Sequence, residues 1–343
     1  MPVYICERCL KEFSQKSHYN IHLKRKNPCQ NNKGKIEEVI EKMVNEKIDN
    51  TLNEKLIERN ENINNTSLSL NNMNSLDQFY TKEHISEECI NTLKKYISFN
   101  DYDYILEPSA GTGSFYKLLP KNKRIGLDLE PKFNGILKMD YFDFIPKKNK
   151  KYIVIGNPPF GKISSLAIKF FNKSANFADV IAFIIPRTFK RVSIQNKLNL
   201  NFKLVYNNDL PVKPCCFTPN MDAKCCFQIW IKDKCKQNII RYDKTHPDFE
   251  FLKLGPKDNK KQPTPPSGAD FVMKAYGSNC GELKCDNLQI LRPKSWHWIK
   301  SNINLEKLKS RFKSLDYSIS KDTVRQDSIG QQEVIYLYKY KYS

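Results

Sequence analysis

Short strand-like runs recur through the middle of the chain, separated by polar stretches; most are apolar throughout, and the second and third end in acidic residues. The runs lie at 104–106, 124–131, 136–142, 152–156, 180–186, 202–206 and 225–231. Helix-like stretches at 164–174 and 188–198 lie between some of them. Strands that are apolar throughout and alternate with helices are typical of a parallel sheet covered on both faces. The last two runs have no helix between them, which predicts a reversed hairpin. The pattern therefore predicts an α/β fold with a seven-stranded, Rossmann-like sheet.

A turn of small residues follows the first run, with the sequence Glu-Pro-Ser-Ala-Gly-Thr-Gly at 107–113. Glycine between a strand and a helix allows the backbone to approach an adenosine-bearing ligand closely. A dinucleotide fingerprint would need a third glycine at position 116, which is Tyr. The turn therefore predicts another adenosine-containing cofactor. Glu107 ends the strand, where we expect it to face a charged amine of that ligand.

A second turn, Asn157-Pro158-Pro159-Phe160, follows the fourth run. Its chemistry suits a planar exocyclic amine, which is a poor nucleophile because its lone pair is delocalised. The Asn157 oxygen and the Pro158 carbonyl can accept from the amine's two hydrogens, and the prolines hold these acceptors rigid. Phe160 can stack on the base. The turn at 107–113 or the turn at 157–160, taken alone, is commonly an ordinary loop. The order and spacing of the two turns favour a functional site.

Acidic residues end the next two strands. Asp128 lies about twenty residues after the first strand, where an acid can hold ribose hydroxyls. Asp140 ends the third strand. Four consecutive strand ends thus carry residues suited to one cofactor site.

Together these motifs resemble the amino-group class of S-adenosylmethionine-dependent nucleic-acid methyltransferases, and within it the N6-adenine DNA methyltransferases. The segment at 77–82 precedes the first strand and is similar to the family's methionine-binding segment, which gives a gamma-like motif order over 77–231. The resemblance implies S-adenosyl-L-methionine as cofactor, contacted by Tyr80, Thr81, Glu107, Pro108, Ala110, Gly111, Gly113, Asp128, Asp140 and Asn157. It implies a catalytic group of Asn157, Pro158, Pro159 and Phe160.

The substrate is less narrowly defined. The family places a second aromatic residue across the extruded base, and Phe217 is the candidate, with a buried hairpin aromatic as the alternative. N6-adenine methylation of DNA is the main prediction. RNA amines or a protein glutamine amide are alternative targets, and a zinc-finger binding protein with an inactive core is a further alternative. The paired cysteines at 215–216 and 225–226 indicate buried thiols rather than a metal site.

The N-terminal segment at 1–31 predicts a small zinc finger. Its spacing is Cys6-x2-Cys9-x12-His22-x6-Cys29, with Phe13 and Tyr19 placed to form a small core. The last interval is longer than in a two-cysteine, two-histidine finger, and His18 is a competing fourth ligand. Because so short a segment buries little apolar surface, Zn²⁺ binding is expected to stabilise it. Its partner could be nucleic acid or protein.

The remaining segments define four regions: the finger, a helix and Asn/Ser-rich linker at 34–75, a methyltransferase core at 77–240 and an extension at 241–343. Residues 36–56 could form a self-associating helix. In the extension we expect a strand at 270–275, a helix at 296–312 and a lysine-bearing edge strand at 338–342, with target recognition as a possible role.

Composition favours a polyanionic partner, for which duplex DNA is the main candidate, because the 343-residue chain carries a net charge of +20. Part of this charge follows from a lysine-, asparagine- and isoleucine-rich composition typical of A/T-rich coding. A finger fused ahead of such a core resembles proteins of large DNA viruses. Eleven cysteines and the absence of a leader-like segment predict a reducing intracellular compartment, cytoplasm, viral factory or nucleus. The short apolar runs predict no membrane span.

Overall fold

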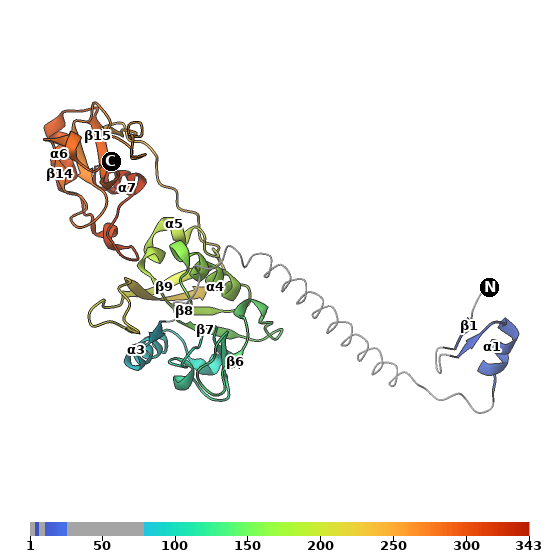
Figure 1. Ribbon diagram of the computed structural model, residues 1–343. Helices are drawn as coiled ribbons and strands as arrows, with labels where there is room; N and C mark the ends of the chain where they lie inside the picture. The colour runs from blue at the N-terminus through green and yellow to red at the C-terminus, as the bar shows by residue number, and fades with distance from the viewer. Residues whose placement is uncertain (1–3, 7–10, 26–78, 343) are drawn as a thin grey trace. The chain divides into compact units, whose positions relative to one another are not determined.

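The computed structural model describes residues 4–6, 11–25 and 79–342 (Figure 1). The chain divides into two compact units, Met1–Asp77 and Gln78–Ser343. In the first unit the described elements form a small ββα arrangement. They are β1 Tyr4–Ile5, β2 Glu12–Phe13 and α1 Lys16–Leu23, with β1 antiparallel to β2.

The second unit is built on a seven-stranded sheet of order β6-β5-β4-β7-β8-β11-β9. The strands are β4 Tyr104–Glu107, β5 Arg124–Asp128, β6 Leu137–Lys138, β7 Tyr152–Gly156, β8 Val180–Pro186, β9 Phe202–Asp209 and β11 Cys225–Lys232. The pairs from β6 through β8 are parallel, and β11 runs antiparallel to β8 and β9. In this order β11 lies antiparallel between β8 and β9, which confirms the predicted seven-stranded, Rossmann-like sheet.

Both faces of this sheet are covered. On one face α3 (Glu83–Leu93) packs through Ile85 and Ile90, while α4 (Ser165–Ala175) covers the other through Phe170 and Phe171. Figure 1 shows the two helices on opposite sides of the strands. A two-stranded sheet of β3 (Tyr80–Thr81) and β10 (Phe217–Thr218) adjoins the core on the α3 face. A short α5 (Val192–Gln195) adjoins the core on the α4 face.

Adjacent side chains of β11 enter different cores because they alternate across the strand. Cys225 and Phe227 belong to the cluster on the α3 face, and Cys226 and Trp230 belong to the cluster on the α4 face. The interpretation of this cysteine pair as buried apolar side chains is confirmed. The stretch expected to be helical at 188–198 is a 3-10 turn at Arg187–Lys190 followed by the single-turn α5.

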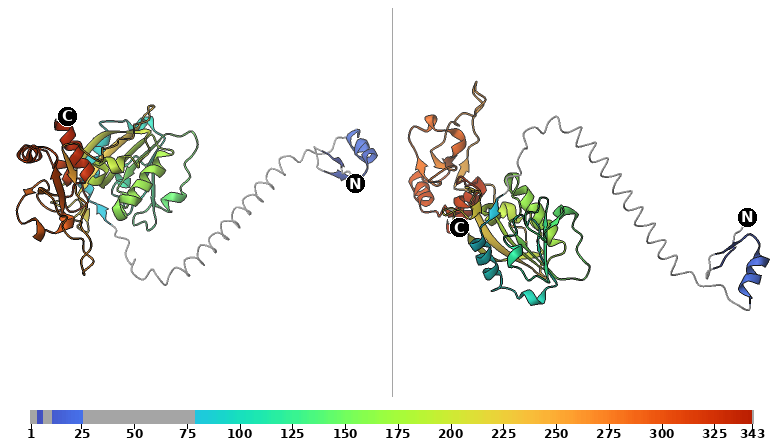
Figure 2. Two further views of the ribbon diagram at one scale, coloured as in Figure 1. Left: turned by 90° about the horizontal axis from the view of Figure 1, so that it is seen from above. Right: turned by 60° about the horizontal axis from the view of Figure 1, so that its bottom comes forward.

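The C-terminal part of this unit has its own antiparallel sheet of order β12-β15-β13-β14. Its elements are β12 Phe249–Phe251, β13 Phe271–Lys274, β14 Leu283–Lys284, β15 Trp296–Ser301, α6 Leu305–Lys313 and α7 Gln331–Tyr342. We call residues 249–342 the C-terminal module; it is the orange and red part of the ribbon (Figure 2). The strand expected at 270–275 is confirmed as β13.

Two expectations for this module are wrong. Residues 296–301 form β15, and only the second half of the predicted 296–312 helix is helical. The terminal tyrosine-lysine run is the end of α7 instead of an edge strand. Val334, Ile335 and Tyr338 are buried at helical spacing, while Tyr336 and Tyr340 are exposed. Packing of this face against the module's core outweighs the two-residue alternation of the run.

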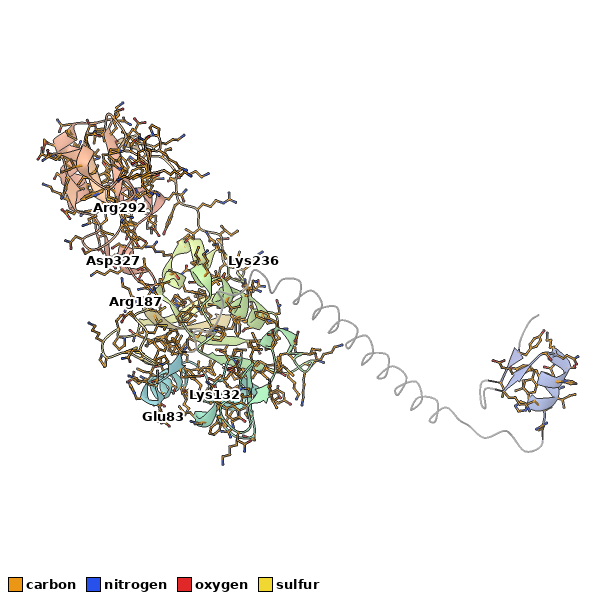
Figure 3. The ribbon with its side chains drawn as sticks, in the orientation of Figure 1. Glu83, Lys132, Arg187, Lys236, Arg292 and Asp327 are labelled. Atoms are coloured by element: carbon orange, nitrogen blue, oxygen red, sulfur yellow. The ribbon has the colours of Figure 1, made fainter. Side chains whose placement is uncertain are left out.

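The module contacts the core through the segment at 316–333. Arg191 donates to the Ser328 and Ile319 carbonyls and lies 3.6 Å from Glu333, and Lys224 pairs with Asp327. Figure 3 labels Asp327 and, on the core, Arg187. Within the described ranges, no helix is long and apolar enough to cross a membrane.

Candidate active site

The glycine turn after β4 adopts a conformation that only glycine accepts easily. Gly111 and Gly113 have φ values of +46° and +78°. A Cβ added to Gly111 would lie 2.7 Å from Cε1 of Tyr80, whose ring covers the turn. Ser114 Oγ donates to the Thr81 carbonyl at 2.7 Å. The predicted methionine-binding segment and the predicted cofactor turn are therefore in direct contact.

Asp128 holds the same turn from the neighbouring strand. Its Oδ2 accepts from Gly111 N–H at 2.7 Å, and its Oδ1 accepts from Glu130 N–H at 2.8 Å. Asp128 is half-buried at the end of β5. Because the carboxyl ends of parallel strands meet at one sheet edge, Glu107, Asp128 and Gly156 all end at this edge.

Glu107 does not face an open ligand site. Its side chain is 2% exposed, and Oε2 accepts from the Tyr116 N–H at 2.7 Å. Burial raises the pKa of the Glu107 carboxyl well above its ordinary value, against the opposing effect of backbone hydrogen bonds from Tyr116 and Phe115. The expectation that Glu107 meets a ligand amine is therefore corrected: the carboxyl supports the turn from beneath.

Asn157 has one end of its carboxamide paired and the other unpaired. Nδ2 donates to the Phe79 carbonyl at 3.2 Å, while the buried Oδ1 has no hydrogen-bond partner among the described residues. Ser109 Oγ, from the glycine turn, donates to the Asn157 carbonyl at 3.1 Å. A buried acceptor without a donor costs free energy, so its presence beside the cofactor turn indicates a ligand donor. Thr81 Oγ1 is a second buried polar atom with no partner in the described part of the chain.

The other residues of the turn after β7 differ in their exposure, and Phe160 is the aromatic residue among them. Pro158 is buried and Pro159 exposed, whereas Phe160 is half-buried and packs against the core on the α3 face. Its carbonyl accepts from the backbone N–H groups of Leu166 and Ala167, both at 3.2 Å. These bonds tie the turn to the start of α4.

Two predicted ligand-contacting residues have other surroundings. Phe217 is 2% exposed in the core on the α3 face and pairs with Thr81 across β10 and β3. The structure favours the alternative of a buried hairpin aromatic, because no face of its ring is open to a base. Asp140 is exposed beyond β6, and its Oδ1 accepts from Phe142 N–H at 2.9 Å. Pro108 and Ala110 are buried within the cofactor turn.

Some residues at the site were missed from the sequence. Phe133 packs 3.2 Å from the Cβ position of Gly113, and Lys132 Nζ lies 5.2 Å from the centre of the Tyr80 ring. The Tyr80 hydroxyl raises the pKa of Lys132. Both residues follow the acidic end of β5, and that position was the only available signal. Figure 3 labels Lys132.

The N-terminal unit contains the described part of the segment predicted to be a finger. Cys6 and His22 are buried, and the Phe13 ring lies 5.0 Å from His22 and 6.0 Å from Tyr19. These rings lie near one another, as a small aromatic core would require. His18 is exposed. Cys9 and Cys29, and the predicted linker helix at 36–56, lie outside the described residues. Within 4–6, 11–25 and 79–342, no group of three or more candidate ligand side chains could hold a metal ion, so the Zn²⁺ site stays a prediction.

No family model matches the chain. No curated protein matches it either. Among solved structures it is similar to the 23S rRNA methyltransferase ErmE, with 12% identity, a TM-score of 0.35, and coverage of 48% of this chain and 72% of that one. It is also similar to a dimethyladenosine transferase from Plasmodium falciparum, with 17% identity, a TM-score of 0.32, and coverage of 46% and 64%. At these values the likeness carries no argument about substrate, and the fold assignment rests on the strand order of the chain itself.

Proposed function

We propose that this protein is an S-adenosylmethionine-dependent methyltransferase that modifies the N6 amine of adenine in DNA. The observation that carries the proposal is the buried Oδ1 of Asn157, which has no hydrogen-bond partner among residues 4–6, 11–25 and 79–342. It is held beside a glycine turn that suits an adenosine-bearing cofactor. A catalytic acceptor aimed at a substrate amine has no donor until the substrate binds.

The residues that would hold the cofactor come from three strand ends. The glycine turn at 111–113 lies against the Tyr80 ring, and Asp128 is proposed to hold the ribose. Tyr80 and Thr81 are proposed to line the methionine side. When bound, S-adenosylmethionine supplies an electrophilic methyl group. The residues present fit this group because Thr81 Oγ1 is buried and lacks a partner in the described chain.

The chain's own contribution is to orient the amine. Asn157 Oδ1 and the Pro158 carbonyl accept from its two hydrogens, which draws the nitrogen toward tetrahedral geometry. The Nδ2 bond to Phe79 fixes which end of the carboxamide faces the substrate. Phe160, held by its carbonyl bonds to α4, stacks on the base. The site needs no general base before transfer, because the amine attacks the methyl group through its lone pair. The resulting nitrogen is positively charged and then loses one of its two protons to water.

Nucleic acid is proposed as the partner, with duplex DNA first. The net charge of +20 favours a polyanion. The C-terminal module is proposed to contribute target recognition, because Val324, in the segment that joins it to the core, packs against the same cluster as Phe160. The N-terminal finger, with Zn²⁺ bound through Cys6, Cys9, His22 and Cys29, is proposed as an auxiliary anchor.

One experiment tests the proposal. The protein is incubated with methyl-labelled S-adenosylmethionine and, separately, duplex DNA, single-stranded DNA, RNA and protein, and the labelled products are hydrolysed and identified. N6-methyladenine in DNA supports the proposal; label only in RNA or in glutamine would move the substrate to that class.

Asp128→Ala should weaken cofactor binding about tenfold or more in calorimetry, since it loses both the ribose contact and the Gly111 bond. Unchanged affinity would remove Asp128 from the cofactor site.

A further inference from the structure

The loop after Phe160 has a strained tip. Gly161, Ile163 and Ser164 have φ values of +66°, +53° and +59°. This left-handed region is costly for any residue with a Cβ, and most of all for a β-branched one such as isoleucine. Strain of this kind persists only where surrounding contacts impose it, and it gathers at functional sites.

The contacts that impose it lie on both sides of the tip. On one side the Phe160 carbonyl accepts from the N–H groups of Leu166 and Ala167. On the other side Ser164, which is 2% exposed, places its Oγ 2.9 Å from Thr188 Oγ1. The loop is thus closed at its base and anchored to the turn after β8, and its tip is directed outward.

The tip carries an apolar side chain where the fold gives it nothing to bury. Ile163 is 76% exposed. Single exposed apolar residues are common and need no explanation. Ile145, which is 86% exposed, and Ile290, which is 83% exposed, are of that ordinary kind, because neither has a positive φ. Ile163 combines exposure, strain and a place three residues from the proposed base-stacking Phe160.

We propose that Ile163 is an apolar wedge that enters the duplex and fills the space left by the target adenine while that base occupies the site at Asn157. The inference rests on the proposed function. An enzyme that modifies a base amine must take the base out of the stack, and an apolar side chain inserted between base steps offsets part of the unstacking cost. Ile163 and Phe160 belong to one loop that is held by hydrogen bonds on both sides, so insertion of Ile163 and stacking of the extruded base on Phe160 are coupled. Because the loop tip is rigid, it loses little conformational entropy on insertion.

The test compares a duplex with a paired target adenine against the same duplex with that adenine mismatched, and against the single strand. Ile163→Ala is expected to lower kcat/KM on the paired duplex on the order of tenfold or more, and to change it less than about twofold on the single strand, where no base needs to be extruded. The mismatch should give an intermediate loss. Ile163→Met, which keeps an apolar side chain of similar reach, should retain most of the activity on the paired duplex.

Two controls separate a wedge from a structural role. Ile145→Ala removes an isoleucine that is even more exposed than Ile163. It lies near Lys147, which contacts Tyr104 and Tyr152 at the opposite, amino-terminal edge of the sheet. Activity on all three substrates should be unchanged. Ile163→Gly should unfold at no lower temperature than wild type, because glycine adopts φ +53° freely, yet it should lose activity on the paired duplex as Ile163→Ala does. Fluorescence of an environment-sensitive adenine analogue at the target position reports extrusion without chemistry and should rise less with either variant than with wild type.

The outcomes are distinguishable. An equal loss of kcat/KM on paired and single-stranded substrates, or no loss on either, overturns the wedge. So does a wild-type protein that methylates single strands and never the duplex, which would leave the proposed methyl transfer intact. Absence of methyl transfer to every nucleic acid overturns the proposed function itself.

Discussion

Replacement of Asn157 by alanine should separate stability from activity. The side chain makes one hydrogen bond, from Nδ2 to the Phe79 carbonyl at 3.2 Å, and keeps Oδ1 buried and unpaired within the described chain. Loss of one bond of this kind costs about 0.5–1.5 kcal/mol, whereas removal of a buried acceptor without a partner relieves about 1–3 kcal/mol. The two effects oppose each other, so the free energy of unfolding should fall by no more than about 0.5 kcal/mol and could rise by up to about 2.5 kcal/mol.

Turnover should respond very differently to the same substitution. Asn157→Ala removes an acceptor that is preorganised for the substrate amine, and removal of such a group typically lowers the rate by about 10²–10³, or roughly 2.7–4 kcal/mol of transition-state stabilisation. Cofactor affinity should change only a few-fold, because the glycine turn and Asp128 remain. Single-turnover methyl transfer, calorimetric cofactor binding and urea unfolding measure the three quantities.

Asn172→Ala is the matched control on α4. Its Nδ2 donates to the Lys197 carbonyl at 2.9 Å, and its Oδ1 accepts from Asn199 N–H at 2.8 Å, so both ends of the carboxamide are paired. This variant should lose about 1–2 kcal/mol of stability and keep its turnover. The reasoning is refuted if Asn157→Ala keeps turnover within about threefold of wild type, or if it destabilises the fold as much as Asn172→Ala does.

The remaining predictions concern other parts of the chain. Burial raises the pKa of Glu107, so its charge opposes folding above the ordinary carboxyl pKa, and this cost disappears as pH falls through the raised value. Glu107→Gln should therefore be at least as stable as wild type at neutral pH. Denaturant titrations should show that this difference in stability is lost in acid. Gly111→Ala should cost about 1–2 kcal/mol of stability and weaken calorimetric cofactor binding, because the new methyl meets the Tyr80 ring; full binding would contradict this packing. Arg191→Ala should destabilise the second unit by about 2 kcal/mol and speed proteolysis between module and core, and unchanged cleavage would count against this docking contact. Metal analysis should find about one Zn²⁺ per chain in wild type and less in Cys6→Ser; equal content would exclude this ligand.

Much of the core follows from the sequence because strand ends and apolar runs are local signals. An uninterrupted apolar run such as 180–186 has no polar face to present to water, so it predicts a central strand, and β8 is buried along its whole length. The carboxyl ends of parallel strands meet at one edge of the sheet, which is why the sequence predicts that Asp128 and the turn after β7 belong to one site. The alternation of Cys225 and Cys226 between two cores follows from strand geometry alone.

The failures came where tertiary packing decides between two local possibilities. Residues 296–301 contain two tryptophans and an isoleucine that suit a helix or a strand, and pairing with β12 and β13 selects the strand. Tyr338 lies in a run that alternates like a strand, but its burial with Val334 fixes a helix. The direction of the Glu107 carboxyl was equally out of reach, since it depends on where the Tyr116 N–H lies after the turn has folded.

β3 connects both halves of the site. Its neighbour Phe79 accepts from Asn157, its Thr81 carbonyl accepts from Ser114 of the glycine turn, and the Tyr80 ring covers Gly111.

Since β3 has only two residues, it needs support, and that comes from antiparallel pairing with β10, where Phe217 pairs with Thr81 and is buried. Phe217 therefore has a physical role at the site although it does not face a base: it anchors the strand that orients the Asn157 carboxamide. The sequence pointed to the right residue for the wrong reason, because contact with a substrate and support of the strand beside it both place an aromatic side chain in the hairpin that follows the sixth strand.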